Sequence, residues 1–236
     1  MHNLHALRLA GLALAAVIGT SGAQAATIVK NSSVVSNIPG LTGFATTGAM
    51  MTGLSVRAVF SNGLDQTFLW ATTGATSGGV TAANWGLSLV GDSFDQSWNF
   101  TINGQAGLGA LTMLVLDGSN SFTVFDTTNP SFGTPDSAQG RDFEIVGDVT
   151  LDGNTTATYT NAVGVTPNAP VGDLFQTVTV TFNSVAGGPL LGPRSGFRFG
   201  QDTDNDARLN LVPEPGSLAL AGLALAALAS IRRRRA

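Results

Sequence analysis

The residues best suited to chemistry in this sequence are the carboxylates Asp202, Asp204 and Asp206, which alternate with two uncharged residues. Alternate carboxylates are typical of the first half of a calcium loop, where hard oxygen donors converge on one cation. The second half departs from that pattern, because Ala207 replaces the glycine of the sharp turn and Pro213 replaces the bidentate glutamate. Two interpretations stay open: a calcium site completed by backbone carbonyls, or a solvated acidic turn beside a neighbouring arginine.

A second pair of carboxylates lies on a predicted strand. Asp142 and Glu144 are two residues apart, so they share one face of that strand, and Asp148 and Asp152 flank its end. Paired carboxylates can perform the acid–base chemistry of a glycosidase, which also needs a cleft and a carboxyl of raised pKa. The sequence shows neither, so exposed strand carboxylates are the alternative.

The chain offers few side chains that could act as the general base of a hydrolase. There is no cysteine, which excludes thiol catalysis and thiolate metal sites. The two histidines, His2 and His5, lie in an N-terminal segment that we expect to be removed. Lys30 then remains as the base for a hydroxyl nucleophile, and it lies in no recognisable motif. We therefore predict a protein that is not an enzyme and has no catalytic residues.

Two sets of side chains could bind a ligand without chemistry. Large aromatic rings can stack on sugars, although in alternating strands they more often lie in the core. The candidates are Trp70, Trp85, Trp98 and Tyr159. Thr177, Thr179 and Thr181 form one row that could belong to an ice-binding surface, but a single short row is weak evidence.

The N-terminus has the three regions of a secretory signal peptide. A short polar stretch contains Arg8, the apolar run 9–19 follows, and Ala23 and Ala25 stand at the two positions that a signal peptidase inspects. The apolar run is too short to span a membrane. We therefore expect residues 1–25 to be a signal peptide that is cleaved after Ala25.

The exported part, residues 26–211, is acidic. It contains six basic and 14 acidic residues, a net charge of −8, whereas the whole chain carries −4. Such a surface disfavours nucleic acid and anionic lipid as partners, and it tolerates cations and neutral sugars. A domain of this size can bury a sufficient core without disulfides.

Short apolar runs separated by turn residues predict an all-β domain. The clearest alternating runs are 56–60, 97–102, 176–182 and 196–199, and 110–116 is apolar on both faces. Further candidate strands are 66–71, 85–90, 122–125, 143–149 and 156–161. Since no amphipathic helical pattern separates these strands, we expect an antiparallel β-sandwich, jelly-roll-like in its connections.

Turn signals add detail to this architecture. Asn103 and Gly104 predict a hairpin between the strands at 98–102 and 110–116. The proline-containing stretches 129–140 and 166–172 predict long exposed loops.

The C-terminal segment 212–236 has three parts in a fixed order. Pro213 and Pro215 forbid a regular helix or strand, so this part should be extended. The run 218–231 is uncharged and rich in Leu and Ala, which predicts a hydrophobic helix. Its length of about 21 Å is shorter than a hydrocarbon core of roughly 30 Å. A terminal basic cluster should remain on the cytoplasmic side of a membrane: Arg232, Arg233, Arg234 and Arg235.

This segment resembles the PEP-CTERM sorting signal of Gram-negative bacteria, a motif also called the ice-binding protein C-terminal motif. Pro213, Glu214 and Pro215 match it residue by residue, and the helix and arginine cluster follow in the expected order. The resemblance implies recognition by exosortase, a membrane processing enzyme, and a link to extracellular polysaccharide and biofilm. Alternatives for the tail are a permanent single-span anchor or a helix that docks on the domain.

Together these features predict an exported cell-surface or matrix protein of a Gram-negative bacterium. It would be anchored transiently in the inner membrane by its C-terminal helix and then released to the cell surface. No cofactor is expected, and whether calcium binds at Asp202, Asp204 and Asp206 stays open between the two interpretations above. The alternative function is that of a carbohydrate-binding module acting on extracellular polysaccharide.

Overall fold

The computed structural model describes residues 25–42, 45–103, 108–129, 133–134, 137, 140–183 and 196–208. The predicted signal helix with Ala23, the sorting motif Pro213, Glu214 and Pro215, the hydrophobic helix and the arginine cluster lie outside these ranges. No helix among the described residues is long and apolar enough to cross a membrane.

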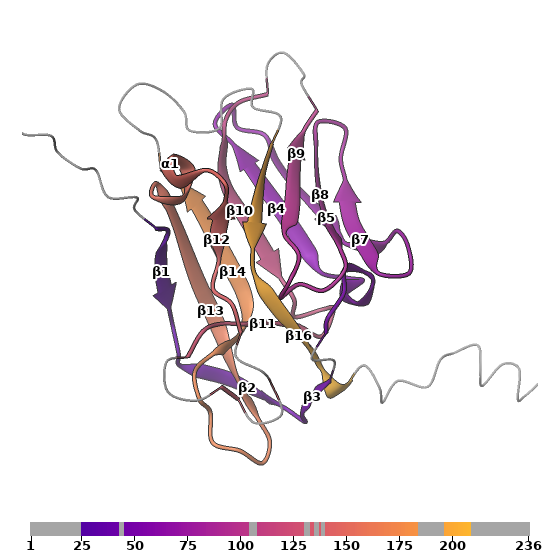
Figure 1. Ribbon diagram of the computed structural model, residues 1–236, viewed down its shortest axis with the longest axis vertical. Helices are drawn as coiled ribbons and strands as arrows, with labels where there is room; N and C mark the ends of the chain where they lie inside the picture. Colours follow the sequence, from indigo (N-terminus) through magenta and orange to yellow (C-terminus); the bar gives the residue numbers. More distant parts are fainter. Residues whose placement is uncertain are drawn as a thin grey trace, which may run out of the picture.

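The described strands form two sheets (Figure 1). The larger sheet contains β1 (Thr27–Lys30), β2 (Val34–Ile38), β3 (Leu41–Thr42), β4 (Ser55–Phe60), β5 (Asp65–Leu69), β10 (Leu111–Asp117), β11 (Thr123–Asp126), β13 (Thr155–Val165), β14 (Leu174–Phe182) and β16 (Asp202–Asp206). The smaller sheet contains β6 (Ala71–Thr72), β7 (Ser77–Thr81), β8 (Trp85–Val90), β9 (Trp98–Ile102), β12 (Glu144–Val146) and β15 (Gly196–Gly200). The described residues also contain two single turns of helix, η1 (Gly48–Met51) and α1 (Val149–Asp152).

The prediction of an all-β, antiparallel architecture is confirmed, with two exceptions at one edge. The larger sheet runs in the order β3-β16-β11-β14-β10-β4-β5, and β13 lies along β14. The strands β1 and β2 pair with β13 in parallel, one with each half of that long strand. Because both are short edge strands with largely exposed residues, they lack the apolar alternation that identified the other strands.

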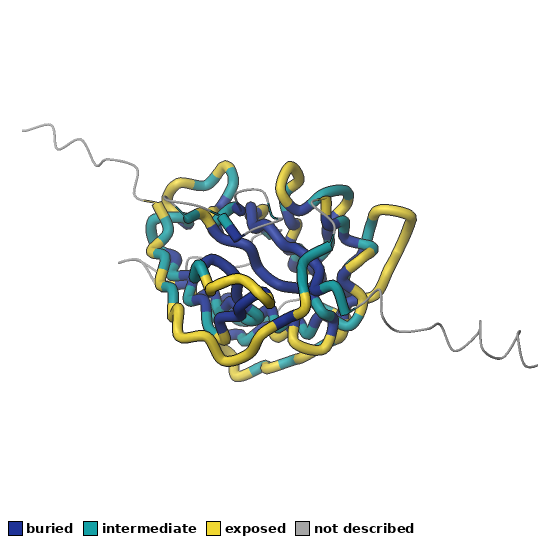
Figure 2. The backbone as a smooth tube through the Cα atoms, turned by 90° about the horizontal axis from the view of Figure 1, so that it is seen from below, coloured by how far each residue is buried: buried dark blue, intermediate teal, exposed yellow. Residues whose placement is uncertain are grey.

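The two sheets share one apolar core. Side chains alternate along β4 and β14, so that Val56, Ala58, Val178 and Val180 face the interior. The smaller sheet contributes large rings, and the ring of Trp85 contacts that of Phe68 across the sheets at 5.7 Å. Figure 2 shows the buried stretches of the chain gathered in the middle, with exposed turns around them.

The predicted hairpin at Asn103 is wrong. The strand β9 pairs with β8 and β15 in the smaller sheet, whereas β10 pairs with β4 and β14 in the larger sheet. The apolar faces of both strands must point into the same core from opposite sides, and a tight hairpin would place them in one sheet. The connection after Asn103 therefore crosses between the sheets.

A buried glutamine links the two sheets at a second crossing. Gln201 is the single residue between β15 of the smaller sheet and β16 of the larger one, and it is fully buried. Its backbone carbonyl accepts the indole N–H of Trp98 at 2.9 Å, and its side-chain oxygen accepts the hydroxyl of Tyr159. Its amide nitrogen donates to the carbonyl of Asp202 at 2.8 Å and to that of Arg141 at 3.2 Å.

We expect Gln201→Leu to lower the free energy of unfolding by about 2–4 kcal/mol, because the shape is nearly kept while several buried polar partners lose their hydrogen bonds. The loss is measured by urea unfolding of the full chain, followed by tryptophan fluorescence. Gln96→Leu is the control, since Gln96 is exposed, and it should change stability by less than about 0.5 kcal/mol. Equal effects of the two variants would contradict this role of Gln201.

Candidate functional site: a buried carboxylate cluster

The interpretation of the acidic run as a solvated turn is wrong. Residues Asp202–Asp206 form the strand β16, and all five are buried. This strand lies between β3 and β11, and Asp202 stands opposite Asp126 while Asp204 stands opposite Val124. Because side chains alternate along a strand, Asp126, Asp202 and Asp204 project from the same face of the sheet. The carboxylates that were expected in solvent are therefore held inside the domain.

Two of these carboxylates meet at one hydroxyl group. The Oγ atom of Ser137 lies 2.8 Å from Oδ2 of Asp126 and 2.6 Å from Oδ2 of Asp204. A serine hydroxyl carries a single proton, so it can donate to only one of these two oxygens at a time. The other contact needs a proton on the carboxyl group or a cation between the oxygens.

The second oxygen of Asp126 has no hydrogen-bond partner in the described structure. The residue is only 1% exposed, so water does not solvate this oxygen freely. A buried carboxylate oxygen without a partner loses much of the free energy of its hydration, and native proteins rarely leave one in this state. Asp126 is therefore the most poorly compensated member of the cluster.

The other buried carboxylates have separate partners. Asp202 accepts hydrogen bonds from the hydroxyl of Ser93 at 3.0 Å and from the backbone N–H of Thr203 at 2.8 Å. Asp173 accepts the backbone N–H of Thr134 at 2.8 Å and its hydroxyl at 2.5 Å.

Asp206 forms an ion pair with Arg208, as expected for a local counter-charge. The guanidinium group of Arg208 also lies 5.2 Å from the ring centroid of Phe122. Within the ranges that the structure describes, Arg208 is the cation that pairs with this strand, and it neutralises only Asp206.

Burial raises the pKa of three carboxyl groups in the cluster. The pKa of Asp126 rises to about 8, chiefly by desolvation and also by the neighbouring Asp204, although the hydrogen bond from Ser137 opposes the shift. Desolvation is also the largest cause for Asp202, whose pKa rises to about 7, and for Asp204, whose pKa rises to about 6. The cluster therefore holds protons at pH values where an exposed aspartate has lost them.

The calcium site that was predicted at Asp202, Asp204 and Asp206 does not form as a convergent triad. In the described part of the chain, no three Asp, Glu, His or Cys side chains converge to hold a metal ion. The reason is the extended backbone, because alternate residues of a strand lie about 6.6 Å apart and cannot close around one ion as they would in a loop.

The carboxylates Asp142 and Glu144 do not form an acid–base pair. Asp142 lies before β12 and forms an ion pair with Lys30 at 2.7 Å, which occupies the only lysine. Glu144 forms an ion pair with Arg141. The predicted strand 143–149 ends at Val146, because a turn and the helix α1 follow.

The two carboxylates near that helix have structural roles. Asp148 caps α1 by accepting the backbone N–H of Leu151 at 3.0 Å. Asp152 accepts the backbone N–H of Ile145 at 2.8 Å. The first bond caps the helix itself, and the second ties the helix to β12.

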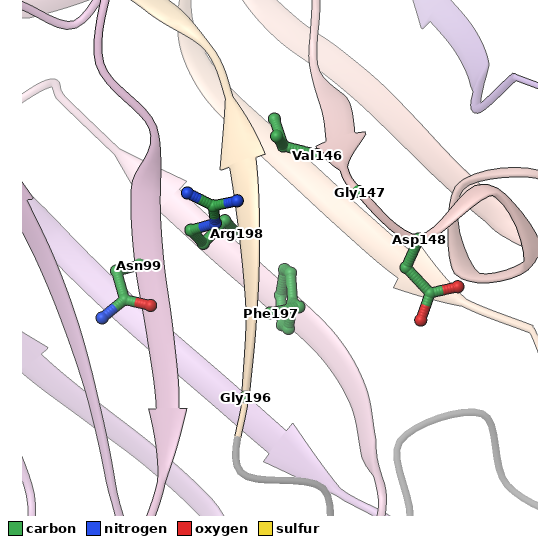
Figure 3. A pocket seen from close by; sticks show the side chains of 7 residues that line it. All are labelled: Asn99, Val146, Gly147, Asp148, Gly196, Phe197 and Arg198. Carbon is green, nitrogen blue, oxygen red and sulfur yellow. The ribbon is translucent and has the colours of Figure 1, made fainter.

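A shallow hollow of about 320 Å³ lies over β9, β15 and the end of β12 (Figure 3). Asn99 and Arg198 line it from neighbouring strands, and Asp148 lies on the far side of Phe197. Asp148 is the one carboxylate among the lining residues, so the hollow lacks the second carboxylate that glycoside hydrolysis needs.

The aromatic candidates for sugar stacking are core residues. None of the four is more than 1% exposed: Trp70, Trp85, Trp98 and Tyr159. Two of the tryptophans stack inside the smaller sheet, with Trp85 on Phe100 and Trp98 on Phe199, each at 5.6 Å between ring centroids. A sugar ring cannot reach them in this fold.

The threonine row of β14 continues on the adjacent strand. Thr177, Thr179 and Thr181 stand directly opposite threonines of β13. The three cross-strand pairs are Thr160 with Thr177, Thr158 with Thr179, and Thr156 with Thr181. These six residues, the threonine ladder, are partly or fully exposed on the outer face of the larger sheet.

Comparison with known proteins finds a match in the C-terminal segment. Residues 211–235 match the family model of the PEP-CTERM protein-sorting motif. The chain carries a PEP-CTERM sorting motif. Such a motif indicates an extracellular protein that exosortase sorts, and it directs export through the membrane to the cell surface of Gram-negative bacteria. No curated protein and no solved structure matches the sequence.

Stability of the domain should fall as the pH rises from 5 to 8 in a chelating buffer. The folded carboxyls have raised pKa values, of about 8 for Asp126, so the native state holds protons that the unfolded state has lost above its ordinary pKa. The protons are lost from the native state only as the pH passes the raised values, and the expected loss is on the order of 3 kcal/mol. Urea unfolding at each pH measures it.

Asp126→Asn should reduce this slope, because the amide cannot ionise and needs no proton at high pH. Asp95→Asn is the matched control on an exposed aspartate, and it should leave the slope unchanged. A wild-type protein whose stability rises between pH 5 and pH 8 would contradict the assignment.

Proposed function

We propose that this protein is a non-enzymatic, exported surface or matrix component, a jelly-roll-like β-sandwich linked to exopolysaccharide or biofilm. The observation that carries the proposal is the PEP-CTERM match over residues 211–235, which indicates an exosortase-sorted extracellular protein. The predicted signal peptide 1–25 supports the same route, because it would send the domain across the inner membrane.

The two ends give one consistent topology in this proposal. Arg8 and the terminal arginines stay in the cytoplasm, and the domain between them is outside. The hydrophobic helix holds the chain in the inner membrane until exosortase processes it near Pro213, Glu214 and Pro215. A tail that is kept would instead leave the domain as an anchored surface protein.

The composition of the exported part supports a role without catalysis. Residues 26–211 contain neither histidine nor cysteine. Lys30 is engaged with Asp142, and the carboxylates of β12 and α1 are engaged in ion pairs or in backbone hydrogen bonds. A hydrolase of the triad type would therefore lack its base.

A carbohydrate-binding module is the second candidate, and the threonine ladder favours it. Its hydroxyl groups are neutral donors and acceptors in register on two strands, a chemistry that suits the hydroxyls of a polysaccharide. The burial of the tryptophans means that such binding would run through hydrogen bonds rather than ring stacking.

Replacing Pro213, Glu214 and Pro215 together by alanine should leave the domain folded but block its processing. We expect the variant to stay in the inner membrane as a longer form, whereas the wild type is released. Intact-mass measurement and cell fractionation report both steps at once. Unchanged mass and location in the variant would rule out the sorting role of the motif.

Lysines in the threonine ladder should abolish binding to the polysaccharide of the producing strain if the second candidate is right. The variant is Thr158→Lys with Thr179→Lys, which places two long charged side chains at the centre of the ladder. Thr81→Lys in β7 of the other sheet is the control and should bind normally. Equal co-sedimentation of all three proteins would exclude the ladder as the contact surface.

A further inference from the structure

We propose that Asp126 and Asp204 bind one calcium ion between β11 and β16, with the hydroxyl of Ser137 as a third ligand. This site differs from the predicted triad along β16, because its two carboxylates come from neighbouring strands. The proposal is independent of how the protein is sorted, since all its residues lie within the folded domain.

The first step is the balance of charge. Asp126 and Asp204 are 1% and 5% exposed, and neither forms an ion pair among the described residues. Two ionised carboxylates at this depth repel each other and lose hydration, so the folded state needs positive charge beside them. One divalent cation supplies two positive charges and neutralises the pair.

The second step is the position of the oxygens. Ser137 brings the Oδ2 atoms of Asp126 and Asp204 to one point, within hydrogen-bond distance of its own Oγ. The single hydroxyl proton satisfies one carboxylate and leaves the other facing a lone pair of Oγ. A cation at this point turns the unfavourable contact into coordination by three oxygens.

The third step is the unpartnered oxygen. Oδ1 of Asp126 is buried and accepts no hydrogen bond in the described structure, so it is free to make Asp126 a bidentate ligand. Gly140 lies directly beside this carboxyl group. A Cβ atom added at Gly140 would lie 2.5 Å from Cγ of Asp126, so this position accepts no side chain while the carboxyl stays in place.

The fourth step is the choice of cation. All the donors are hard oxygens, with no nitrogen or sulfur ligand, and this set suits calcium rather than zinc or copper. Calcium takes 6–8 oxygen ligands with flexible geometry, so water can complete a set that the two carboxylates begin. Magnesium demands a stricter octahedral arrangement and should bind less well.

The loop that supplies Ser137 is also fastened to the larger sheet. Thr134 bonds to Asp173 through its backbone N–H and its hydroxyl, and Asp173 lies directly before β14. These two hydrogen bonds fix the position of Thr134, three residues before Ser137. The loop of Ser137 is thus anchored beside β14, whereas Asp126 and Asp204 lie on β11 and β16.

Calcium should raise the thermal midpoint of the full chain purified in mild detergent. We expect a rise of about 5 °C or more when chelator is replaced by calcium at a hundredfold excess over the dissociation constant, with a further increase per decade of calcium. Magnesium at the same concentration should give a smaller shift. Isothermal titration with calcium should show one site per chain.

Asp126→Asn and Asp204→Asn should each abolish the calcium shift and the titration signal. Both amides are neutral, so these variants should still fold in chelator, as circular dichroism would verify. Asp95→Asn is the matched control and should keep the full shift. Ser137→Ala should weaken calcium binding about tenfold without abolishing it, because it removes one neutral ligand.

Three results would overturn the proposal. The first is a wild-type midpoint that does not respond to calcium. The second is a shift of equal size in Asp126→Asn, which would place the ion elsewhere. The third is a midpoint that responds to pH but not to calcium, which would assign a shared proton to the carboxyl pair.

Discussion

The structure depends on a crossing that carries the chain from one sheet to the other in a single residue. Gln201 connects the end of β15 in the smaller sheet to the start of β16 in the larger one. Its hydrogen bonds reach Trp98 in one sheet and Tyr159 in the other, so the distance between the sheets is set there. The hydroxyl of Tyr159 also accepts the backbone N–H of Phe143 at 2.8 Å, which extends the network to the segment before β12.

This polar network fixes the arrangement of the two sheets in an exported domain that has no disulfide. The chain has no cysteine, and its core of aromatic and aliphatic side chains comes from both sheets. Apolar packing gives most of the stability but little directional information, whereas satisfied buried hydrogen bonds select one arrangement. The glutamine and the carboxylates beside it therefore define how the sheets meet, and an unsatisfied member would be costly.

Much of the fold could be predicted because alternation of polarity is a local signal. The strands around Trp85, Trp98 and Val178 lie within one or two residues of their predicted bounds. Partner choice is not local, which is why the turn at Asn103 was misread as a hairpin. The burial of apolar side chains determines the partners of the two flanking strands, since both strands must face the same core.

The acidic site was only half predictable for a related reason. The spacing of Asp202 and Asp204 singled out the correct residues, but it predicted a loop or a solvated turn. Their place in a buried strand depends on β3 and β11 on either side. Asp126 gave no signal, because it follows an apolar run as any strand-ending aspartate would. Ser137 approaches from a loop, and only the tertiary structure brings it to the two carboxylates.

The position of β16 has a mechanical consequence. It is the last strand that the structure describes, and it lies between β3 and β11 rather than at an open edge (Figure 1). Any tension on the C-terminal segment therefore enters the domain through a strand whose backbone is bonded on both sides. Since those hydrogen bonds must break before the strand can leave, a domain tethered by its C-terminus would be held at its point of attachment by pairing with two strands.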